Sequence, residues 1–507
     1  MRKILILTVL AFLFAGALPA WAGGGDEQQG AKQFRMFGAG FGHGLGMSQW
    51  GAFGLSKKGW GAEKIVKHFY SGTRVARGSG PGDLRIGLVQ GKDVIRLIAE
   101  AGDVELRLGG PQGQLVATVP SGATWKVKAA GNDYRIVNGA GETVDTVGGT
   151  GNPLFVVYQS LGSRVRVPEA FHTYNRGKIE FDLYSCDGEC VMRLVLSVDP
   201  QGYLYGLGEV PSSWPMPAMK AQAIAARSYA FAKAAVSQHR AVCDCALYAS
   251  ANDQVYAGWD KEGGVDGARW VAAVDQTNRK VVLDGNQTIQ AFYMSSSGGF
   301  TENNENVWGG SPIGYLRGVC DPGDFTTSNP NATWVETFTT SQVTQELGLG
   351  IGAVEGFADE VRGVSGRIIS VTVRGANGQQ SISGNALRSA LGLHDDRVWI
   401  NSNRLVTGAI RDKYDRLGCS PGLPESAEAG VAGGRRQKFQ DGVIYFSSGT
   451  GAHELHGAVL THYQQRGGPG GNLGFPTSDV QTLQNGNRRA HFEHGVITCD
   501  GSNCSVG

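Results

Sequence analysis

Glycine occupies 78 of the 507 positions, about twice its usual share, and its distribution limits what this chain can fold into. It is scattered through patterned segments without a collagen period, so it signals many turns and close backbone approaches. It is densest over residues 37–52, FGAGFGHGLGMSQWGA, a spacing that predicts neither helix nor regular strand. The apolar spacing from Ala52 to Tyr70 then predicts a helix. Residues 34–75 are therefore expected to form a loop and a helix.

Residues 1–22 have the pattern of a Sec signal peptide. Two positive charges precede a mostly apolar run from Ile4 to Ala15, and the stretch LPAWA then ends at Ala22. The run is shorter than the roughly 20 residues that a membrane span needs, and no later segment comes close. We expect a secreted protein without a membrane span, whose mature chain begins near Gly23. The formal net charge of +1 argues neither for nucleic acid nor for an anionic membrane as partner.

The chain is long enough for about three domains. Short β-branched runs alternate with glycine turns over residues 84–167, which predicts a small all-β insert. Strands follow from residue 178, and the most helical segment runs from Ala218 to Gln238, after prolines that a first helical turn tolerates. The predicted fold class is α+β: a mixed-sheet catalytic domain over 178–419 with a central Ala-rich helix, which also includes the 34–75 block.

An internal repeat ends the chain. The ten residues from Arg435, RRQKFQDGVI, recur from Arg488 as RRAHFEHGVI. Residues 420–434 are expected to be a linker and residues 435–507 a small repeat module. The aromatic side chains Phe439, Tyr445, Phe475 and Phe492 are expected in its core, because aromatic residues dominate small cores.

The eight cysteines are an even number in a chain expected outside the cell, which favours disulfides. Cys499 and Cys504 are close enough in sequence to be expected as one pair. The pairing of the other six cannot be deduced from the sequence.

Glu209 is a candidate for catalysis. It lies in the glycine-flanked turn of GLGEVPSSWP, beside Leu207 and Val210, directly before the Ala-rich helix. A carboxylic acid among apolar groups keeps its proton to a higher pH, which suits a general acid. The alternative is a structural glutamate whose pKa the helix dipole lowers.

Polar side chains follow on the same helix at Lys220, Gln222, Arg227 and Tyr229. Lys220 and Arg227 are seven residues apart and so share a face with apolar neighbours. Two cations on such a face suggest the wall of a groove. The alternative is a pair of side chains that extend along the edge of a core.

Four motifs resemble the stage II sporulation protein D and amidase-enhancer family. They are GLGEVPSSWPMPAMKAQAIAARSYA from Gly206, DQVYAG from Asp253, AFYMSSSGGFTE from Ala291 and GHGLGMSQWGA from Gly42. The resemblance covers about residues 40 to 75 and 178 to 410. In the family the last of these blocks ends the domain, whereas here it precedes the others, so the order is permuted. A permutation is acceptable where the original termini lie close together, but it leaves open whether His43 reaches the groove or is a structural histidine.

The resemblance implies that Glu209 is the catalytic acid of a lytic transglycosylase. It also implies that Lys220 and Arg227 line the substrate groove, opposite a loop of small residues that let a sugar approach the backbone. The expected substrate-binding residues are Lys220, Gln222, Arg227, Tyr229, Ser295, Ser296, Ser297, Gly298, Gly299, Thr301, Glu302, His43 and Gln49.

Members of this family can bind zinc near the end of the helix, and His239, Cys243 and Cys245 have ligand-like types at close spacing. No fourth ligand is evident, and thiols outside the cell tend to oxidise. We therefore predict disulfides, no metal site and no cofactor, with zinc at these three residues as the alternative. The repeat around LGFP, from Leu473, resembles LGFP modules of envelope proteins, which are thought to hold them to the wall.

A lytic transglycosylase needs one carboxyl group, whereas a hydrolase normally needs a second one about 5 to 10 Å away. Glu302 and Asp253 are candidates for the second. The expected function is cleavage of peptidoglycan glycan strands, peptide-free ones by resemblance, at the bond from N-acetylmuramic acid to N-acetylglucosamine. The alternative is a non-catalytic wall-binding enhancer of an N-acetylmuramoyl-L-alanine amidase, with that cell-wall amidase as partner.

Overall fold

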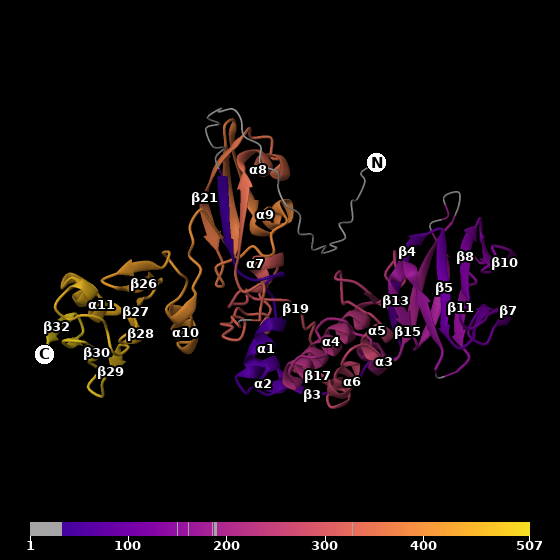
Figure 1. Cartoon of the computed structure of the whole chain (residues 1–507), viewed down its shortest axis with the longest axis horizontal. Coiled ribbons are helices and arrows are strands. Elements are labelled where there is room, and N and C mark those ends of the chain that lie inside the picture. The colour runs from indigo at the N-terminus through magenta and orange to yellow at the C-terminus, as the bar shows by residue number, and fades with distance from the viewer. Residues whose placement is uncertain (1–32, 150, 161, 185, 187–189, 327) are drawn as a thin grey trace, which may run out of the picture.

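The structure is a computed structural model that describes residues 33–149, 151–160, 162–184, 186, 190–326 and 328–507. The predicted signal peptide and the predicted start of the mature chain lie outside the described residues. Figure 1 shows an elongated molecule with β-rich parts at both ends and a group of helices between them. No helix within the described ranges has the length and apolar character to cross a membrane.

A two-sheet β-sandwich forms one end of the molecule (Figure 1). The first sheet has the order β16-β4-β15-β14-β11-β6-β7 and the second the order β10-β9-β8-β5-β12-β13. Apolar side chains from both sheets share one buried core. The strands are β4 (Leu84–Lys92), β5 (Val94–Ala101), β6 (Val104–Leu108), β7 (Gln114–Val119), β8 (Thr124–Ala130), β9 (Asp133–Val137), β10 (Thr143–Gly148), β11 (Leu154–Tyr158), β12 (Arg164–Val167), β13 (His172–Tyr174), β14 (Lys178–Tyr184), β15 (Val191–Val198) and β16 (Leu247–Tyr248).

The sandwich extends past the expected insert. Strand β14 pairs with β11, and β15 pairs with β4, both antiparallel. The strands expected to begin the catalytic domain at residue 178 therefore share a sheet with the 84–167 unit. The alternation of apolar residues predicts a strand but not its partner.

The Ala-rich segment forms the long helix α4 (Met216–Val236), which lies at the centre of the helical part. Its small alanine side chains let neighbouring elements pack closely on several sides. The neighbours of α4 are α1 (Gln49–Lys57), α2 (Ala62–Phe69), α3 (Pro200–Tyr205), α6 (Gly267–Asp275), β16, β17 (Lys280–Asp284) and β18 (Gln287–Thr288). Strand β17 also pairs with β3 (Arg74–Arg77), and α5 (Trp259–Glu262) contacts α3 and α6.

The N-terminal glycine block differs from the expectation in two ways. Helix α1 begins inside it at Gln49, where the Ser48 hydroxyl accepts a hydrogen bond from the Gly51 N–H at 2.9 Å. The single helix predicted from Ala52 to Tyr70 is two helices. Gly59 separates them because it has a left-handed φ of +84°.

A third part has its own core and joins distant segments. Strand β1 (Gln33–Gly38) lies between β20 (Trp334–Thr339) and β24 (Val398–Ile400). A separate sheet of β21 (Val354–Arg362), β22 (Ile368–Gly375) and β23 (Gly378–Ser383) packs with α8 (Thr340–Leu347) and α9 (Gly384–Leu391). The pairing of β1 thus anchors the permuted N-terminal block to chain some 300 residues away, as the register Phe37 with Val335 shows.

The C-terminal module consists of two four-stranded sheets and α11 (Gly457–Gln465) around a shared core. The two copies of the repeat fall on equivalent strand pairs, β26–β27 and β30–β31. Of the four aromatic residues expected in this core, Tyr445, Phe475 and Phe492 lie in it, whereas Phe439 is buried in a separate small core. The strands are β25 (Ala429–Val431), β26 (Gly434–Lys438), β27 (Val443–Ser447), β28 (Gly451–Leu455), β29 (Gln481–Thr482), β30 (Arg488–Phe492), β31 (Gly495–Asp500) and β32 (Asn503–Val506).

The expected linker over residues 420–434 contains β25, which pairs with β26. Helix α10 (Gly408–Arg416) precedes it and shares a small core with Phe439 and Ile444 of the module. The module is therefore packed against the rest of the chain rather than tethered by an extended segment.

All eight cysteines are paired. The bonds are Cys186–Cys190, Cys243–Cys245, Cys320–Cys419 and Cys499–Cys504. The expected Cys499–Cys504 pair is confirmed. Of these bonds, Cys320–Cys419 connects distant segments, since its cysteines are 99 residues apart.

Candidate active site

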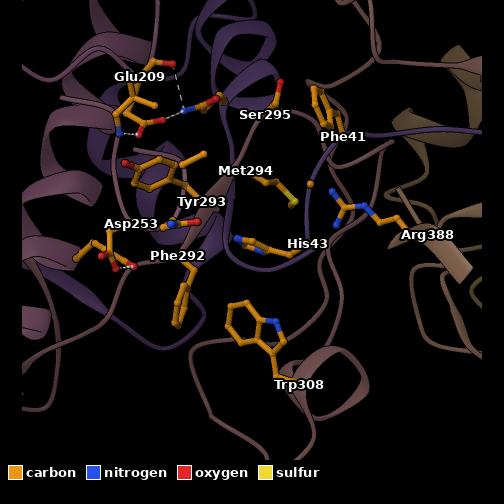
Figure 2. A pocket seen from close by; sticks show the side chains of 16 residues that line it. Phe41, His43, Glu209, Asp253, Phe292, Tyr293, Met294, Ser295, Trp308 and Arg388 are labelled. Carbon is orange, nitrogen blue, oxygen red and sulfur yellow. Dashed lines mark hydrogen bonds between the residues drawn. The ribbon is translucent and has the colours of Figure 1, made fainter. Parts of the chain in front are cut away.

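Glu209 lies in the turn between α3 and α4, at a cavity of about 420 Å³. The turn is fixed by strand-like pairing with the segment around Val255. The Gly208 N–H donates to the Val255 carbonyl at 2.8 Å, and Leu207 and Tyr256 form an isolated antiparallel β-bridge. The same pairing directs the Val255 N–H at the Glu209 carboxylate. Figure 2 shows Glu209 on one wall and His43, Trp308 and Arg388 across the cavity from it.

The Glu209 carboxylate has few partners for a half-buried acid. One oxygen accepts a hydrogen bond from the Val255 N–H at 2.6 Å, and the other accepts from Gln49 Nε2 at 3.3 Å. Burial raises the pKa of Glu209, and it outweighs the opposing effects of Val255, Gln49, the Tyr293 hydroxyl and the Lys261 ammonium. A carboxyl group that stays protonated to a higher pH can act as a general acid.

A buried hydrogen-bond chain supports the floor of the cavity beneath Glu209. The Tyr203 hydroxyl donates to Gln254 Oε1 at 2.9 Å, and Gln254 Nε2 donates to the Tyr293 hydroxyl oxygen at 2.8 Å. Gln254 is fully buried. Because Gln254 Nε2 donates to it, the Tyr293 oxygen can direct its own proton toward Glu209, which holds the acid in place.

Asp253 also lines the cavity, but its charge is compensated. Its carboxylate forms ion pairs with Lys233 at 3.0 Å and with Arg240, and it accepts hydrogen bonds from the Tyr248 N–H and the Tyr229 hydroxyl. Burial alone would raise the pKa of Asp253, but these partners outweigh burial and the pKa is lowered. Asp253 is therefore a stable carboxylate that positions Tyr229.

A second cavity opens on the other side of Glu209, lined by residues 208–213 and by Asp260, Lys261, Val265 and Asp266. The Lys261 ammonium donates to the Val210 carbonyl, and burial lowers the pKa of Lys261 to about 8. Glu209 is common to both cavities. A chain-like ligand that crossed Glu209 would have room on both sides.

The permuted N-terminal block reaches the first cavity. Strand β2 (Met47–Ser48) pairs in parallel with β19 (Tyr293–Met294), and Phe41 bridges Ser296. These pairings place His43 and Gln49 in the lining. Burial, with Arg367 and Arg388, lowers the pKa of His43 to about 4, so its ring is neutral at neutral pH.

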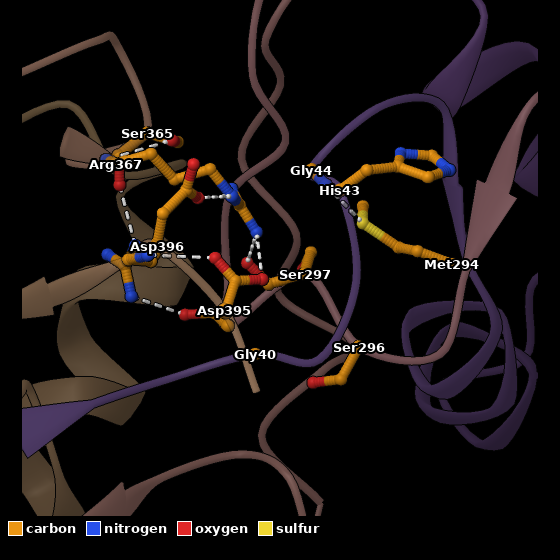
Figure 3. Close-up of polar contacts among 12 residues, drawn as sticks. Gly40, His43, Gly44, Met294, Ser296, Ser297, Ser365, Arg367, Asp395 and Asp396 are labelled. Atoms are coloured by element: carbon orange, nitrogen blue, oxygen red, sulfur yellow. Dashed lines mark hydrogen bonds and ion pairs between the residues drawn. The ribbon is translucent and has the colours of Figure 1, made fainter. Parts of the chain in front are cut away.

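Behind His43, the buried Arg367 supports the loop that contains Ser297 and Phe300 (Figure 3). Arg367 donates to the Ser297 and Phe300 carbonyls and pairs with Asp395 at 2.8 Å. A side chain at Gly44 would collide with Arg367, because a Cβ there would lie 2.6 Å from its Nε. The glycine at this position is thus required by close approach.

Residues 295–297 form a serine loop, in which Ser295 lines the cavity, whereas Ser296 and Ser297 point into the protein. The Ser296 hydroxyl donates to Asp324 at 2.8 Å, and the Ser297 hydroxyl donates to Asp321 at 2.6 Å. Burial raises the pKa of Asp321 to about 8. These two serines shape the loop from behind.

Other expected binding residues lie away from the cavity. Arg227 is buried and donates to the carbonyls of Thr277 and Lys280, so it holds the backbone that follows α6. The Glu302 carboxylate is buried and accepts hydrogen bonds from Asn306 and from the backbone and hydroxyl of Ser365. The remaining expected residues outside the lining are Lys220, Gln222, Gly298, Gly299 and Thr301.

At the end of α4, Cys243 and Cys245 form a disulfide with each other. His239 Nδ1 lies 2.6 Å from Asp244 Oδ1. Zinc ligation by the two sulfurs would require that the Cys243–Cys245 disulfide be reduced. Zinc analysis of the purified protein decides between the two alternatives.

Most of the apolar wall of the cavity, and the one arginine in its lining, were not predicted from the sequence. Phe292, Tyr293 and Met294 stand directly before the serine loop in a motif that was noticed, so proximity could have suggested them. Trp308 and Arg388 lie outside all four motifs, and no sequence signal marks them. The lining residues that were not expected as binding residues are Phe41, Gly42, Ala251, Asn252, Asp253, Val255, Phe292, Tyr293, Met294, Trp308 and Arg388.

Comparison with known families gives two matches. Residues 191–283 match the SpoIID family, described as Stage II sporulation protein, and residues 422–471 match the LGFP repeat. The chain carries a SpoIID domain and an LGFP repeat. The SpoIID match begins at β15 and ends within β17, so it contains Glu209 and the whole of α4.

Relatives of the SpoIID domain include two sporulation proteins and an enhancer. The chain is 28% identical over 292 residues to Stage II sporulation protein D of Bacillus subtilis (strain 168), a match that covers 54% of this chain and 79% of that protein. It is 26% identical over 224 residues to the protein of the same name from Bacillus amyloliquefaciens, covering 42% and 63%. It is 33% identical over 135 residues to the Amidase enhancer of Bacillus subtilis (strain 168), covering 27% of this chain but 16% of that protein.

Proposed function

We propose that this protein cleaves peptidoglycan glycan strands as a lytic transglycosylase, with Glu209 as its catalytic acid and base. The observation that carries the proposal is the half-buried Glu209 between two cavities, with a pKa raised by burial. The SpoIID match contains this residue. The LGFP repeat supports association with the cell wall.

In the proposed reaction Glu209 gives its proton to the oxygen between N-acetylmuramic acid and N-acetylglucosamine, and that bond breaks. The resulting Glu209 carboxylate takes the proton of the muramyl C6 hydroxyl, whose oxygen bonds to the anomeric carbon. The products are a free N-acetylglucosamine hydroxyl and a 1,6-anhydro end, and Glu209 is protonated again. No water is consumed.

The condition of the other carboxylates favours this reaction over hydrolysis. A hydrolase normally needs a second carboxylate that is free to activate water or to attack the sugar. Asp253 is held by Lys233, Arg240, Tyr229 and a backbone N–H. Glu302 is buried outside the lining.

The test is mass spectrometry of peptide-free glycan digested by the protein and by Glu209→Gln. We expect anhydro ends, lighter by one water than hydrolytic ends, and a loss of roughly 10² to 10⁴-fold in the variant. Reducing ends without the anhydro form would indicate a hydrolase. Normal cleavage by Glu209→Gln would mean that Glu209 is structural.

A second candidate is a non-catalytic enhancer of a cell-wall amidase, which the similarity to the Amidase enhancer favours. On this hypothesis neither form cleaves glycan, and both accelerate a partner amidase equally. The same digest with and without an N-acetylmuramoyl-L-alanine amidase separates the two functions.

A further inference from the structure

Arg388 contributes a positive charge to the lining of the cavity beside Glu209. It comes from α9, far from the SpoIID match, and Figure 2 shows its guanidinium end toward His43 and Met294. Its Nε donates to the Leu393 carbonyl at 3.3 Å, which orients the group. Among the residues that the structure describes, no carboxylate forms an ion pair with Arg388.

The other charged groups of the lining do not balance it. Asp253 is neutralised by two cations, and Glu209 lies on the opposite wall, where its carboxylate accepts hydrogen bonds from Val255 and Gln49 (Figure 2). His43 is neutral at neutral pH. Behind the wall, burial raises the pKa of Asp396, and Arg388 is close enough for its charge to oppose that rise, but the ion pair of Asp396 is with the buried Arg367, at 3.4 Å (Figure 3). An arginine that faces a cavity and forms no ion pair is suited to bind the anion of a ligand.

The same cavity has an aromatic wall. The rings of Phe292 and Trp308 are 4.6 Å apart, and those of His43 and Trp308 are 5.1 Å apart. Trp308 is 52% exposed. Such a wall can stack on the apolar face of a sugar ring. Together, the wall and Arg388 fit a sugar that carries a carboxylate.

We propose that Arg388 binds the free lactyl carboxylate of an N-acetylmuramic acid residue in this cavity, and that it thereby selects strands without peptides. This rests on the proposed function, because it takes the glycan strand as ligand. In peptidoglycan with stem peptides the lactyl group is an amide and carries no charge. Arg388 would then face an uncharged group and lose its charge-assisted hydrogen bonds.

The test measures binding, so that it does not depend on cleavage. Protein with Glu209→Gln is titrated by calorimetry with a peptide-free tetrasaccharide of alternating N-acetylglucosamine and N-acetylmuramic acid. The second ligand is the same tetrasaccharide with its carboxylates converted to methylamides. We expect the acid form to bind about 10-fold to 100-fold more tightly, the size of a charge-assisted hydrogen bond.

Adding Arg388→Gln should raise the Kd of the acid form to that of the methylamide and leave the methylamide unchanged. Arg388→Lys should keep part of the preference, since the charge remains. Arg374→Gln is the matched control: Arg374 lies on β22 of the same part, is exposed, and pairs with Asp359 at 3.6 Å. It should change neither Kd.

Three results would overturn the assignment: no detectable binding of the acid form, equal Kd values for both ligands, or equal weakening of both by Arg388→Gln. The last would mean that Arg388 only supports the fold. If the preference is found but unaltered protein cleaves nothing, the proposed function fails while the binding assignment stands. Cleavage without the preference gives the opposite conclusion.

Discussion

Because burial raises the pKa of Glu209, the stability of the fold should depend on pH in a defined direction. A raised pKa means that the group stabilises the fold fully below its unfolded pKa. That stabilisation is lost as the pH rises through the folded pKa. Glu209→Gln, which cannot ionise, should therefore melt at a higher temperature than the unaltered protein at neutral pH. The difference should shrink as the pH falls through the folded pKa toward the unfolded value of about 4.3 and should not change further below it.

Glu305→Gln is the control, with the opposite sign. The pKa of Glu305 is lowered, first by its hydrogen bond from Arg317. Its stabilisation is present above the unfolded pKa and lost as the pH falls, so its replacement should lower the melting temperature at neutral pH. Calorimetric melting from pH 4 to 8 measures both. The stability gained by Glu209→Gln over the unaltered protein should be larger at pH 7 than at pH 4. A smaller gain at pH 7 than at pH 4 would contradict the environment described for Glu209.

Lys261 should tune the pH profile of cleavage. Its positive charge opposes the effect of burial and lowers the pKa of Glu209. In Lys261→Met, the alkaline limb of kcat/KM should therefore move to higher pH, because Glu209 keeps its proton longer. Lys280→Met removes an exposed lysine that pairs with Glu63 and should leave the profile unchanged. A limb that moves to lower pH would show that another group controls it.

At the scale of elements, the position of β19 depends on the absence of a side chain at Gly46. A Cβ there would lie 2.0 Å from the Phe292 carbonyl oxygen, and Gly46 has a φ of +70°. Gly59 has a similar φ of +84° but open space around it. Gly59→Ala should cost about 1 kcal/mol of unfolding free energy from backbone conformation alone. Gly46→Ala should cost a further 1 to 3 kcal/mol, roughly, from overpacking.

Urea unfolding of both variants measures the difference. Gly46→Ala should also weaken glycan binding, because Phe292 lines the cavity, while Gly59→Ala should not. Equal losses of stability would mean that the loop adjusts freely and does not fix β19.

The local elements were largely predictable, and their partners were not. The Ala-rich pattern predicted α4, and the glycine-flanked turn directed attention to Glu209, which lies at the cavity. Both are local signals. Arg227 was predicted to line the groove, but its guanidinium donates to backbone carbonyls that follow α6. Helical spacing shows which residues share a face of the helix, but it does not show which element packs against that face. Arg388 could not be found because its place in the cavity depends on how β1 pairs with β20 and β24. Such long-range pairing leaves no signal in a single sequence.

At the scale of the whole molecule, the C-terminal module is tied to the part that holds the cavity. Cys320 forms a disulfide with Cys419, which lies just after α10. Cys320 also forms an isolated β-bridge with Phe300, which lies just after the serine loop. On the module side, the rings of Tyr414 and Phe439 stack at 5.1 Å, and Lys413 pairs with Asp479. The module is therefore positioned to hold the cavity at a fixed orientation on any wall that it binds.

Deleting residues 435–507 should separate attachment from chemistry. Every residue that lines either cavity precedes residue 389 in the sequence. The shortened protein should therefore still cleave soluble peptide-free glycan, while it sediments less with isolated cell walls. It should also melt at a lower temperature, since removing Phe439 and Ile444 uncovers α10 and costs a few kcal/mol, at about 1.5 to 3 for each side chain. Full-length Glu209→Gln is the control and should sediment like the unaltered protein. If the shortened protein keeps its circular dichroism but loses cleavage of soluble glycan, the module belongs to the catalytic unit. If it still sediments fully, wall binding resides in the remaining chain, where the exposed Trp308 beside the cavity is the first residue to test.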